Sequence, residues 1–559
     1  MNVRMLLSNL NLLAAAPGGV VRLRELILTL AVQGKLVAQD PKDEPARALL
    51  KKIRTEKDRL IAAGKIKRDK PLAEIAQEGK PFGLPAEWEW VPLQHVGYTQ
   101  TGTTPDKKNP EMYGGDIPFI KPGDIYPNHV EYGNEALSQA GLIDSGRIAP
   151  AGSLLMVCIG TLGKSNLITR DCSFNQQINS VTPLCCLPEY IKLYCRSPYF
   201  QGEVWGRSSS TTIAILNKGK WEAMPLALPP LAEQSRIVTR VEELMRLCDA
   251  LEAKGQLEAT QHAQLVSTLL GTLTDSETPE QLTDNWHRIA THFDLLLDRP
   301  EAVDALEQTI LQLAVRGLLV PQDPQDEPAS ELLKKIRAEK DKLIAEGRIK
   351  RDKPLLRIAE DEQSFALPNG WEWVRLDEIA DNRLGKMLDK AKNTGKRYPY
   401  LRNTNVQWRH IDLDDVKEIS LEASELEEFR LLPGDLLICE GGYPGRCAIW
   451  SDPDREMYFQ KALHRVRPKC GIAVELIAIS LEADSKSGNL DQHFTGATIK
   501  HFVGQALGRY LIPLPPLAEQ SRIVIRVAQL RRLCADLRQR LTASQSTQAK
   551  VAESLIASV

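Results

Sequence analysis

The feature that most constrains this chain is an internal duplication. The eleven residues from Leu228 to Val238 read LPPLAEQSRIV, and the same eleven return from Leu514 to Val524, 286 positions later. A Pro-Pro pair ends a strand and cannot continue inside a helix. The Glu that follows falls in the first helical turn, where the helix dipole favours an acid. The sequence therefore predicts the same strand-to-helix junction twice. Its residues are Pro229, Pro230, Glu233, Gln234, Pro515, Pro516, Glu519 and Gln520.

A longer segment is duplicated as well. Residues 30–72 align without gaps on residues 313–355, and 33 of the 43 positions are identical. The tetrapeptide WEWV at Trp88 returns at Trp371 with the same offset of 283. A period near 285 is far above the repeat length of solenoids and indicates two large modules. The regions between the repeated segments share almost no sequence, which suggests a common scaffold that carries two different variable domains.

These patterns predict an α+β fold with five parts. Gly-bounded apolar runs such as Ser153–Ile159 and Gly434–Cys439 indicate strands. Apolar residues recur every three or four positions from Ile237 through a polar middle to Leu265 and Leu269, which predicts a long helix over residues 231–272, and the 286 offset repeats this seam after Leu517. We expect the two long helices, each about 60 Å, to pack antiparallel as a coiled coil. The predicted parts are a helical segment 1–85, a strand-rich domain 86–230, a central helical region 231–370, a second strand-rich domain 371–516 and a C-terminal helix 517–559.

Bulk composition gives limits on function. The net charge of −2 shows no global basic character, so a nucleic-acid partner would need local positive charge. The ten Cys show no C-x-x-C pair and no zinc-like spacing, which predicts reduced thiols in a cytoplasmic protein without a metal site. No apolar run reaches the ~18 residues of a membrane span. Polar residues such as Ser8 interrupt the apolar start, so we do not expect a secretory signal.

No motif predicts catalysis in this chain. The hexapeptide GTLGKS at Gly160 resembles the tail of a P-loop, but the position of the required first Gly is Cys158. We find neither a Gly-rich loop of the S-adenosylmethionine type nor an Asn-Pro-Pro-Tyr or Asp-Pro-Pro-Tyr tetrapeptide. A nucleophile with a nearby base is not evident either.

One charge cluster favours nucleic-acid binding. Residues 383–409 hold eight Lys and Arg against the single acid Asp389, with aromatic and amide side chains between them. Lys and Arg neutralise phosphates, and Arg, Asn and Gln bond to base edges. The candidates there are Lys386, Lys390, Lys396, Arg397, Arg402, Asn403, Asn405 and Arg409, followed by Lys461 and Arg465. The candidates in the first strand-rich domain are Thr103, Lys107, Lys108, Lys121, Asn175, Gln177 and Ser209. A solvated loop or turn chemistry is the alternative for each.

Taken together, the sequence resembles the specificity (S) subunits of Type I restriction–modification enzymes. The twin junctions and the duplicated helices carry the resemblance over essentially the whole chain. The stretches Thr101–Ile120 and Tyr400–Val406, the latter continued by Phe459–Pro468, are typical of target-recognition domains in that family. The N-terminal half of the helical repeat occurs only in some branches of the family.

The resemblance implies a non-catalytic, cytoplasmic subunit that binds double-stranded DNA. Each recognition domain would read one half of a split target, and the long helices would set the spacer. Two methyltransferase (M) subunits would use S-adenosylmethionine to methylate a flipped adenine, and two restriction (R) subunits would use ATP and Mg²⁺, so this chain itself would hold no cofactor. Because the two variable domains differ, we expect a bipartite, asymmetric target. The alternative is a coiled-coil scaffold whose variable domains bind proteins.

Overall fold

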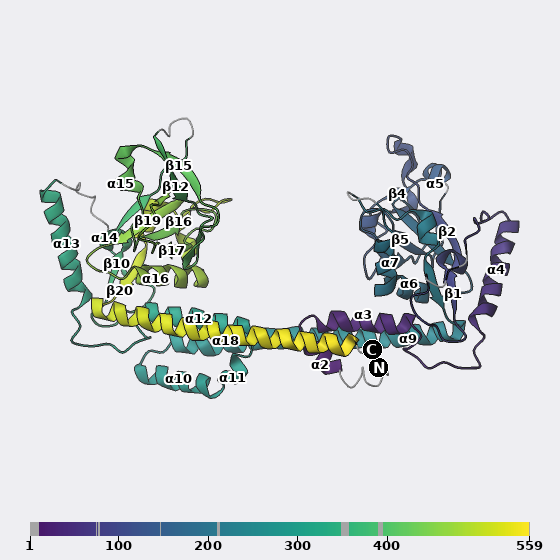
Figure 1. Ribbon diagram of the computed structural model, residues 1–559, viewed down its shortest axis with the longest axis horizontal. Helices are drawn as coiled ribbons and strands as arrows, with labels where there is room; N and C mark the ends of the chain where they lie inside the picture. The colour runs from purple at the N-terminus through teal and green to yellow at the C-terminus, as the bar shows by residue number, and fades with distance from the viewer. Residues whose placement is uncertain are drawn as a thin grey trace. The chain divides into compact units, whose positions relative to one another are not determined.

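The computed structural model describes residues 10–73, 75–76, 79–145, 147–209, 213–347, 357–389 and 395–557. These residues form two compact units (Figure 1). Unit 1 contains residues 1–258 and 545–559, and unit 2 contains residues 259–544. Each unit has one strand-rich domain, which we call strand domain 1 (residues 86–230) and strand domain 2 (residues 371–516). The α+β class predicted from the sequence is confirmed.

Unit 1 begins with helices and continues into strand domain 1. Its first helices are α2 (Leu10–Ala15), α3 (Gly19–Val32) and α4 (Ala46–Ala62). The strands are β1 (Glu89–Pro92), β2 (Gly97–Thr101), β3 (Tyr113–Ile120), β4 (Ala136–Leu137), β5 (Leu154–Val157), β6 (Ser165–Leu167), β7 (Ser173–Phe174), β8 (Ile178–Pro183) and β9 (Pro225–Leu228). Its helices are α5 (Gln139–Ser145), α6 (Pro188–Arg196), α7 (Pro198–Gly206) and α8 (Lys218–Glu222).

Unit 2 repeats this order. Its helices before strand domain 2 are α10 (Pro279–Thr291), α11 (Phe293–Leu296), α12 (Pro300–Val315) and α13 (Ala329–Ala345). The strands are β10 (Glu372–Arg375), β11 (Ala380–Leu384), β12 (Lys396–Leu401), β13 (Val406–Gln407), β14 (His410–Ile411), β15 (Lys417–Leu421), β16 (Leu436–Cys439), β17 (Cys447–Ile449), β18 (Tyr458–Phe459), β19 (Leu463–Pro468) and β20 (Leu511–Leu514). Its helices are α14 (Leu376–Ile379), α15 (Leu426–Phe429), α16 (Val474–Ser487) and α17 (Gly504–Arg509).

The two strand domains share one topology although their sequences differ. Strand domain 1 has a four-stranded sheet in the order β2-β8-β5-β6, a three-stranded sheet β4-β3-β7 and a ribbon β1-β9. Strand domain 2 has the matching sheets β11-β19-β16-β17, β15-β12-β18 and the ribbon β10-β20. In each four-stranded sheet the neighbouring strands are antiparallel, and the central strands β5 and β16 are buried on both faces. Packing in such a core requires apolar side chains of suitable size but not particular residue types. The two domains can therefore keep one topology while their sequences differ.

The long helices predicted from the apolar seams are confirmed as α9 (Leu231–Thr274) and α18 (Leu517–Ala557). Each helix belongs to both units, because α9 starts in unit 1 and ends in unit 2, while α18 does the reverse. The start of each helix therefore lies in the same unit as the end of the other. In unit 1, Ala552 of α18 joins the core that contains Leu244 and Cys248 of α9.

The second half of the predicted α9 seam is wrong by one position. We expected Leu265 to continue the apolar stripe, but it is 51% exposed, while Val266 and Leu270 are buried. The polar stretch around Gly255 separates the two parts of the stripe. A straight α-helix drifts by about 20° per heptad against a 3.5-residue repeat, so the buried stripe after this stretch moves to the neighbouring residue.

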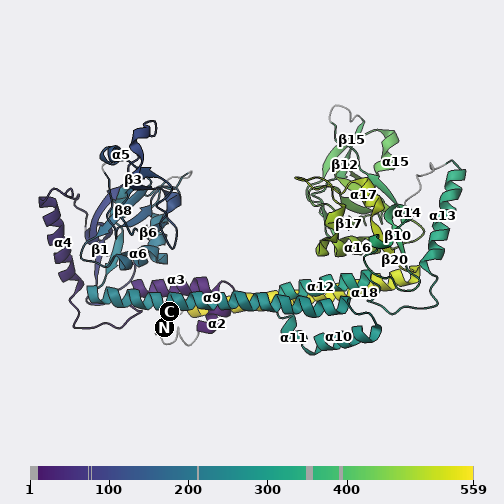
Figure 2. The same ribbon diagram turned by 180° about the vertical axis from the view of Figure 1, so that it is seen from behind.

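The strand domains rest on helical bases in both units. In unit 1, α3 lies along α9 and packs against α6 and α7 of strand domain 1. In unit 2, α12 packs on α16, while α10 and α11 lie on the side of the helices away from strand domain 2 (Figure 2). In the part of the chain that the structure describes, no helix is long and apolar enough to cross a membrane.

Candidate nucleic-acid interface

The duplicated junction is a buried clamp between three separate segments. In unit 1 the Trp88 Nε1–H donates to Glu233 Oε2 at 2.9 Å, and the Gln39 amide donates to Glu233 Oε1 at 2.7 Å. Gln234 donates to the carbonyl of Pro229 at 3.0 Å and accepts from the Leu187 N–H at 2.9 Å. Glu233 and Gln234 are fully buried. The start of α9 is therefore fixed to strand domain 1 and to the N-terminal repeat at once.

Unit 2 builds the same clamp with the duplicated residues. Trp371 donates to Glu519 Oε2 at 3.0 Å, and Gln322 donates to Glu519 Oε1 at 2.7 Å. Gln520 bonds to the carbonyl of Pro515 at 2.9 Å and accepts from the Ala473 N–H at 3.0 Å. Burial raises the pKa of Glu519, although the Trp and Gln donors oppose this shift, and Glu233 behaves in the same way.

An ion pair completes each clamp on its outer side. Arg236 contacts Asp43 at 2.5 Å, and Arg522 contacts Asp326 at 2.5 Å. The sequence predicts that the Glu of the junction lies in the first helical turn, where the helix dipole favours an acid. Glu233 does lie in the first turn of α9. The sequence did not reveal its bonding partners. Their repetition at the constant offset of 283 is the signal that could have identified them.

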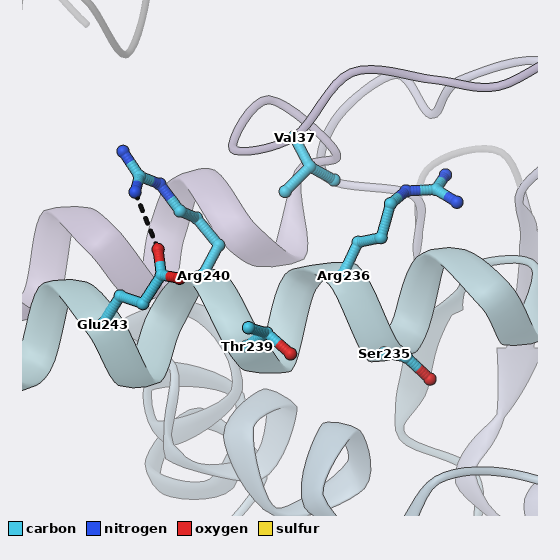
Figure 3. A pocket seen from close by; sticks show the side chains of 6 residues that line it. All are labelled: Val37, Ser235, Arg236, Thr239, Arg240 and Glu243. Carbon is cyan, nitrogen blue, oxygen red and sulfur yellow. Dashed lines mark hydrogen bonds and ion pairs between the residues drawn. The ribbon is translucent and has the colours of Figure 1, made fainter.

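An open hollow lies beside this clamp on α9 (Figure 3). It measures about 410 Å³ and is lined by Val37, Ser235, Arg236, Thr239, Arg240 and Glu243. Its two arginines already hold carboxylates, since Arg236 contacts Asp43 and Arg240 contacts Glu243 at 2.8 Å. Neither arginine of the hollow is therefore free of a carboxylate partner.

The predicted DNA-contacting residues of strand domain 1 fall into two groups. Lys107, Lys108 and Ser209 are exposed. The other side chains are tied into the fold: Thr103 donates to the carbonyl of Ser145 at 2.6 Å, and Lys121 pairs with Glu135 at 2.6 Å. Asn175 is 8% exposed and bonds to the Gln177 amide at 3.1 Å. Within the hydroxyl run that contains Ser209, residues 210–212 lie outside the described part of the chain.

Strand domain 2 shows the same division among its predicted cations. Lys396 and Arg397 on β12 and Lys461 before β19 are exposed, and Arg397 contacts Glu418 at 3.4 Å. Lys386 forms an ion pair with Glu425. Lys390 lies outside the described residues.

Four other predicted residues of strand domain 2 hold loops and strands together. Asn405 is 3% exposed, and its amide accepts from the Arg402 N–H and donates to two carbonyls. The Arg402 side chain bonds to Asp415 at 2.6 Å, and Asn403 bonds to the carbonyl of Gly441 at 3.1 Å. Arg465 is 5% exposed and contacts Asp381 at 2.8 Å. Asn405 and Arg465 are thus structural residues here, because burial leaves their polar atoms no path to a base edge.

Arg409 connects strand domain 2 to its helical base. It lies in a left-handed turn with φ 71°, contacts Glu307 of α12 at 2.8 Å and is half exposed. Glu307 is almost fully buried and also contacts Arg531 and Arg538 of α18. Burial alone would raise the pKa of Glu307, but the Arg538 hydrogen bond and the surrounding cations outweigh it and lower this pKa. Arg409 therefore orients the domain on its base.

Comparisons with known proteins agree with this architecture. The family described as Type I restriction modification DNA specificity domain matches residues 85–261 and again residues 368–544. The specificity subunits of the Type I restriction enzymes EcoAI and EcoEI of Escherichia coli are 35% and 34% identical to this chain over 563 and 565 residues. Each of these two alignments covers 96% of this chain and 93% of the relative.

A solved structure adds evidence on the fold alone. Its description reads "Structural basis underlying complex assembly and conformational transition of the type I R-M system". The matching chain has a TM-score of 0.50 and 18% identity, with 85% of this chain and 98% of that chain covered. The resemblance inferred from the sequence is confirmed, and in this family catalysis lies in other subunits. This chain belongs to the Type I restriction–modification specificity subunits and is the non-catalytic subunit that confers DNA sequence specificity.

Proposed function

We propose that strand domain 1 and strand domain 2 each read one half of a bipartite, asymmetric DNA target, and that α9 and α18 set the spacer between the halves. One observation carries this proposal: two domains of the same topology sit on the same junction clamp, yet their surfaces carry different side chains. A constant frame with variable surfaces suits two readers of different sequences. The major groove of duplex DNA suits this kind of recognition, because each base pair presents there a distinct pattern of hydrogen-bond donors and acceptors.

The partners and cofactors follow from the same proposal. The chain would assemble in the cytoplasm with two methyltransferase (M) subunits and two restriction (R) subunits. S-adenosylmethionine would bind to the M subunits, and ATP and Mg²⁺ to the R subunits, so that this chain would supply only recognition and assembly. The near-neutral charge of the chain supports shared DNA binding, because partner subunits could provide part of the positive clamp.

The proposed phosphate contacts are those predicted Lys and Arg residues whose side chains are exposed. These are Lys107, Lys108, Lys396, Arg397 and Lys461. Phosphate contacts fix the position of a protein on the duplex without reading sequence. We therefore expect Lys107→Ala and Lys396→Ala to weaken binding on all sequences and to reduce the salt dependence, each by about one released counterion. Lys121, Thr103, Gln177, Lys386, Arg402 and Asn403 would act indirectly, by holding the reading loops in place.

Mapping the methylated adenines tests this function. The complex of this chain with its M subunits is incubated with genomic DNA, and the modified positions are sequenced. We expect two different half-sites at a fixed spacing. Exchange of residues 86–230 for those of a relative should change one half-site and leave both the other half-site and the spacer unchanged. A complex that methylates without sequence preference, or that binds proteins but not duplex DNA, would favour the scaffold alternative.

A further inference from the structure

Two turns have the same construction in both strand domains, although the domains share almost no sequence. We call the first the capped turn, which follows β3 as residues 121–124 and β12 as residues 402–405. We call the second the glycine turn, which joins β5 to β6 as residues 160–164 and β16 to β17 as residues 442–446. Turns that remain alike while the surrounding sequence changes suit a task that does not depend on which bases a domain reads.

The capped turn is closed by a side chain at its fourth position. In strand domain 1 the Lys121 N–H donates to the Asp124 carboxylate at 2.7 Å. In strand domain 2 the Arg402 N–H donates to the side-chain oxygen of Asn405 at 2.9 Å. A carboxylate and an amide can both close the turn, because each offers an oxygen that accepts the bond. The capped turn therefore keeps one shape with different residues.

The glycine turn contains two glycines at fixed positions. Gly160 and Gly163 have φ values of +86° and +80°, and Gly442 and Gly445 have +82° and +86°. Glycine adopts this left-handed conformation without the strain that a side chain would add. The GTLGKS motif at Gly160, which resembles a P-loop, is thus one copy of a turn that both strand domains use.

A cation follows the second glycine in both domains and connects the two turns. Lys164 Nζ donates to the carbonyl of Pro122 at 2.9 Å, and the Arg446 guanidinium donates to the carbonyl of Asn403 at 2.8 Å. Both carbonyls belong to the second residue of the capped turn. Among the residues that the structure describes, no carboxylate lies within ion-pair distance of either cation. The same bond therefore holds a cation without an acid in each domain.

The cation that starts the capped turn is neutralised, in contrast. Lys121 pairs with Glu135 and Arg402 pairs with Asp415, both at 2.6 Å. Of the two cations that meet at these turns, the same one is paired with an acid in both domains, and the same one is not. Partial burial weakens the hydration of a charge, and an anion from a partner would compensate for this loss.

An exposed tyrosine lies beside each unpaired cation. Lys164 Nζ is 5.3 Å from the ring centre of Tyr126, which is 43% exposed and stacks on His129. The Arg446 guanidinium is 4.5 Å from the ring centre of Tyr443, which is 68% exposed. Tyr126 follows the capped turn, whereas Tyr443 belongs to the glycine turn. The two domains thus build the same cation–aromatic pair from different positions, so the duplication of one motif does not explain it.

The chemistry of these pairs suits the sugar–phosphate backbone of DNA. An ammonium or guanidinium group binds a phosphate oxygen through a charge-assisted hydrogen bond. Attraction to the face of an aromatic ring holds such a cation in place. Backbone contacts fix the register of a protein on the duplex and carry no sequence information. A contact of this kind is what two readers of different sequences can have in common.

We propose that Lys164 and Arg446 each bind a DNA phosphate at the equivalent place in their half-sites, and that Tyr126 and Tyr443 position them. This inference rests on the proposed function, since each strand domain must lie on its half-site. It adds a shared pair of contacts to the phosphate contacts proposed above. Because the junction clamps also match, the two phosphates should lie at the same number of nucleotides from the methylated adenine of their half-sites.

Neutral methylphosphonate linkages test these contacts in the full complex with M subunits. A single linkage replaces one phosphate of the mapped target at a time, and binding to each duplex is measured. In each half-site we expect one linkage that weakens the wild-type complex but not the variant that lacks the facing cation. The variants are Lys164→Gln for strand domain 1 and Arg446→Gln for strand domain 2, because Gln keeps an N–H donor for the capped turn.

The salt dependence of binding separates the cations from the tyrosines. Lys164→Gln and Arg446→Gln should each lower it by about one released counterion, on the target and on unrelated duplex alike. Tyr443→Leu should weaken binding about two- to fivefold without this change, because the charge remains, and Tyr443→Phe should bind like the wild type. Lys254 of α9 is exposed and lies outside both strand domains, so Lys254→Gln is the matched control and should change neither quantity.

Three results would overturn the shared contact while the mapped half-sites uphold the proposed function. The first is a linkage scan in which both Gln variants respond like the wild type. The second is a pair of sensitive linkages at different distances from the two methylated adenines. The third is loss of M-subunit binding by Arg446→Gln in the absence of DNA, because the cation would then meet an acid of the methyltransferase. A wild-type complex without half-site preference would overturn the proposed function itself.

Discussion

The two units attach α3 and α12 to their long helices through the same positions but with opposite charges. In unit 1, Arg24 of α3 contacts Asp249 and Glu252 of α9 at 2.6 and 2.8 Å. The counterpart of Arg24 is Glu307 of α12, at the offset of 283, and the counterpart of Glu252 is Arg538 of α18, at the offset of 286. These counterparts contact each other at 3.0 Å. The junction clamps, by contrast, are the same in both units.

The difference shows how a duplicated protein keeps its halves apart. The two helices bury the same apolar residues at matching positions, such as Leu23 and Leu306 or Ile27 and Ile310, so apolar packing alone would let either helix dock on either long helix. A misplaced α12 would bring Glu307 against Glu252, and a misplaced α3 would bring Arg24 against Arg538. Like charges at a close contact disfavour the wrong pairing, a device that sets partner choice in other helical assemblies. The clamp can stay identical because it connects elements of the same half.

Reversal of the buried charge should have the largest effect. Glu307→Arg would place a cation among Arg409, Arg531 and Arg538, with almost no access to water. We expect unit 2 to lose about 3–5 kcal/mol of stability, the cost typical of an uncompensated buried charge. Hydrogen exchange in α12 and α16 measures this loss locally, which is necessary because a chain with two units need not unfold in two states.

A double variant tests whether lost charge pairing or steric misfit causes the instability of Glu307→Arg. Glu307→Arg combined with Arg538→Glu copies the polarity of unit 1 into unit 2, and contacting residues of this kind are typically coupled by 0.5–3 kcal/mol. Part of the lost protection should return in the double variant. If the double variant were as unstable as the sum of the single variants, steric misfit and not charge would explain the loss.

The sequence predicted the frame of this molecule better than its interfaces. The duplication, the junctions and both long helices could be inferred because Pro-Pro pairs and heptad seams act over short distances. The charge reversal could not, because Arg24 and Glu252 lie 228 positions apart and nothing local connects them. The basic cluster at residues 383–409 stays a prediction as a DNA-contacting site. The sequence could not show which of its charges are paired, because some meet acids brought in from elsewhere by the fold, such as Asp415 for Arg402 and Glu425 for Lys386.

The identical clamps should respond identically. Glu233→Ala and Glu519→Ala each leave a buried Trp N–H without its acceptor, which costs about 1–3 kcal/mol, whereas Gln39 and Gln322 keep their bonds to the carbonyls of Gly34 and Gly317. We expect equal losses of exchange protection at the starts of α9 and α18, within about 0.5 kcal/mol. The exposed Glu243→Ala in α9 serves as the control. A large difference between the two clamps would mean that the junctions, like the docking contacts, have diverged in energy.

Acid should weaken the docking contact of unit 2. The pKa of Glu307 is lowered from its usual 4.5, so this carboxylate adds stability above the unfolded value, and the contribution is lost as the pH falls through the lower folded value. The pKa of Glu519 is raised, so its effect has the opposite sign and favours the folded clamp below 4.5. Between pH 6 and 3, protection of α12, relative to the intrinsic exchange rate at each pH, should therefore fall. Glu307→Gln should abolish most of this dependence, and a dependence unchanged in that variant would assign it to other acids.

Truncation of Arg24, the counterpart of Glu307 in unit 1, should have the smallest effect. The Arg24 side chain is 28% exposed, and its partners Asp249 and Glu252 are 67% and 44% exposed. Water and salt screen such pairs, so Arg24→Ala should cost about 0.2–1 kcal/mol, and 0.5 M salt should reduce the difference further. Hydrogen exchange in α3, compared with the Arg22→Ala variant, measures it. A loss as large as that of Glu307→Arg would show that exposure does not decide the strength of these contacts. A small loss would mean that the two units resist mispairing unequally, and that the buried charge of α12 supplies most of the discrimination.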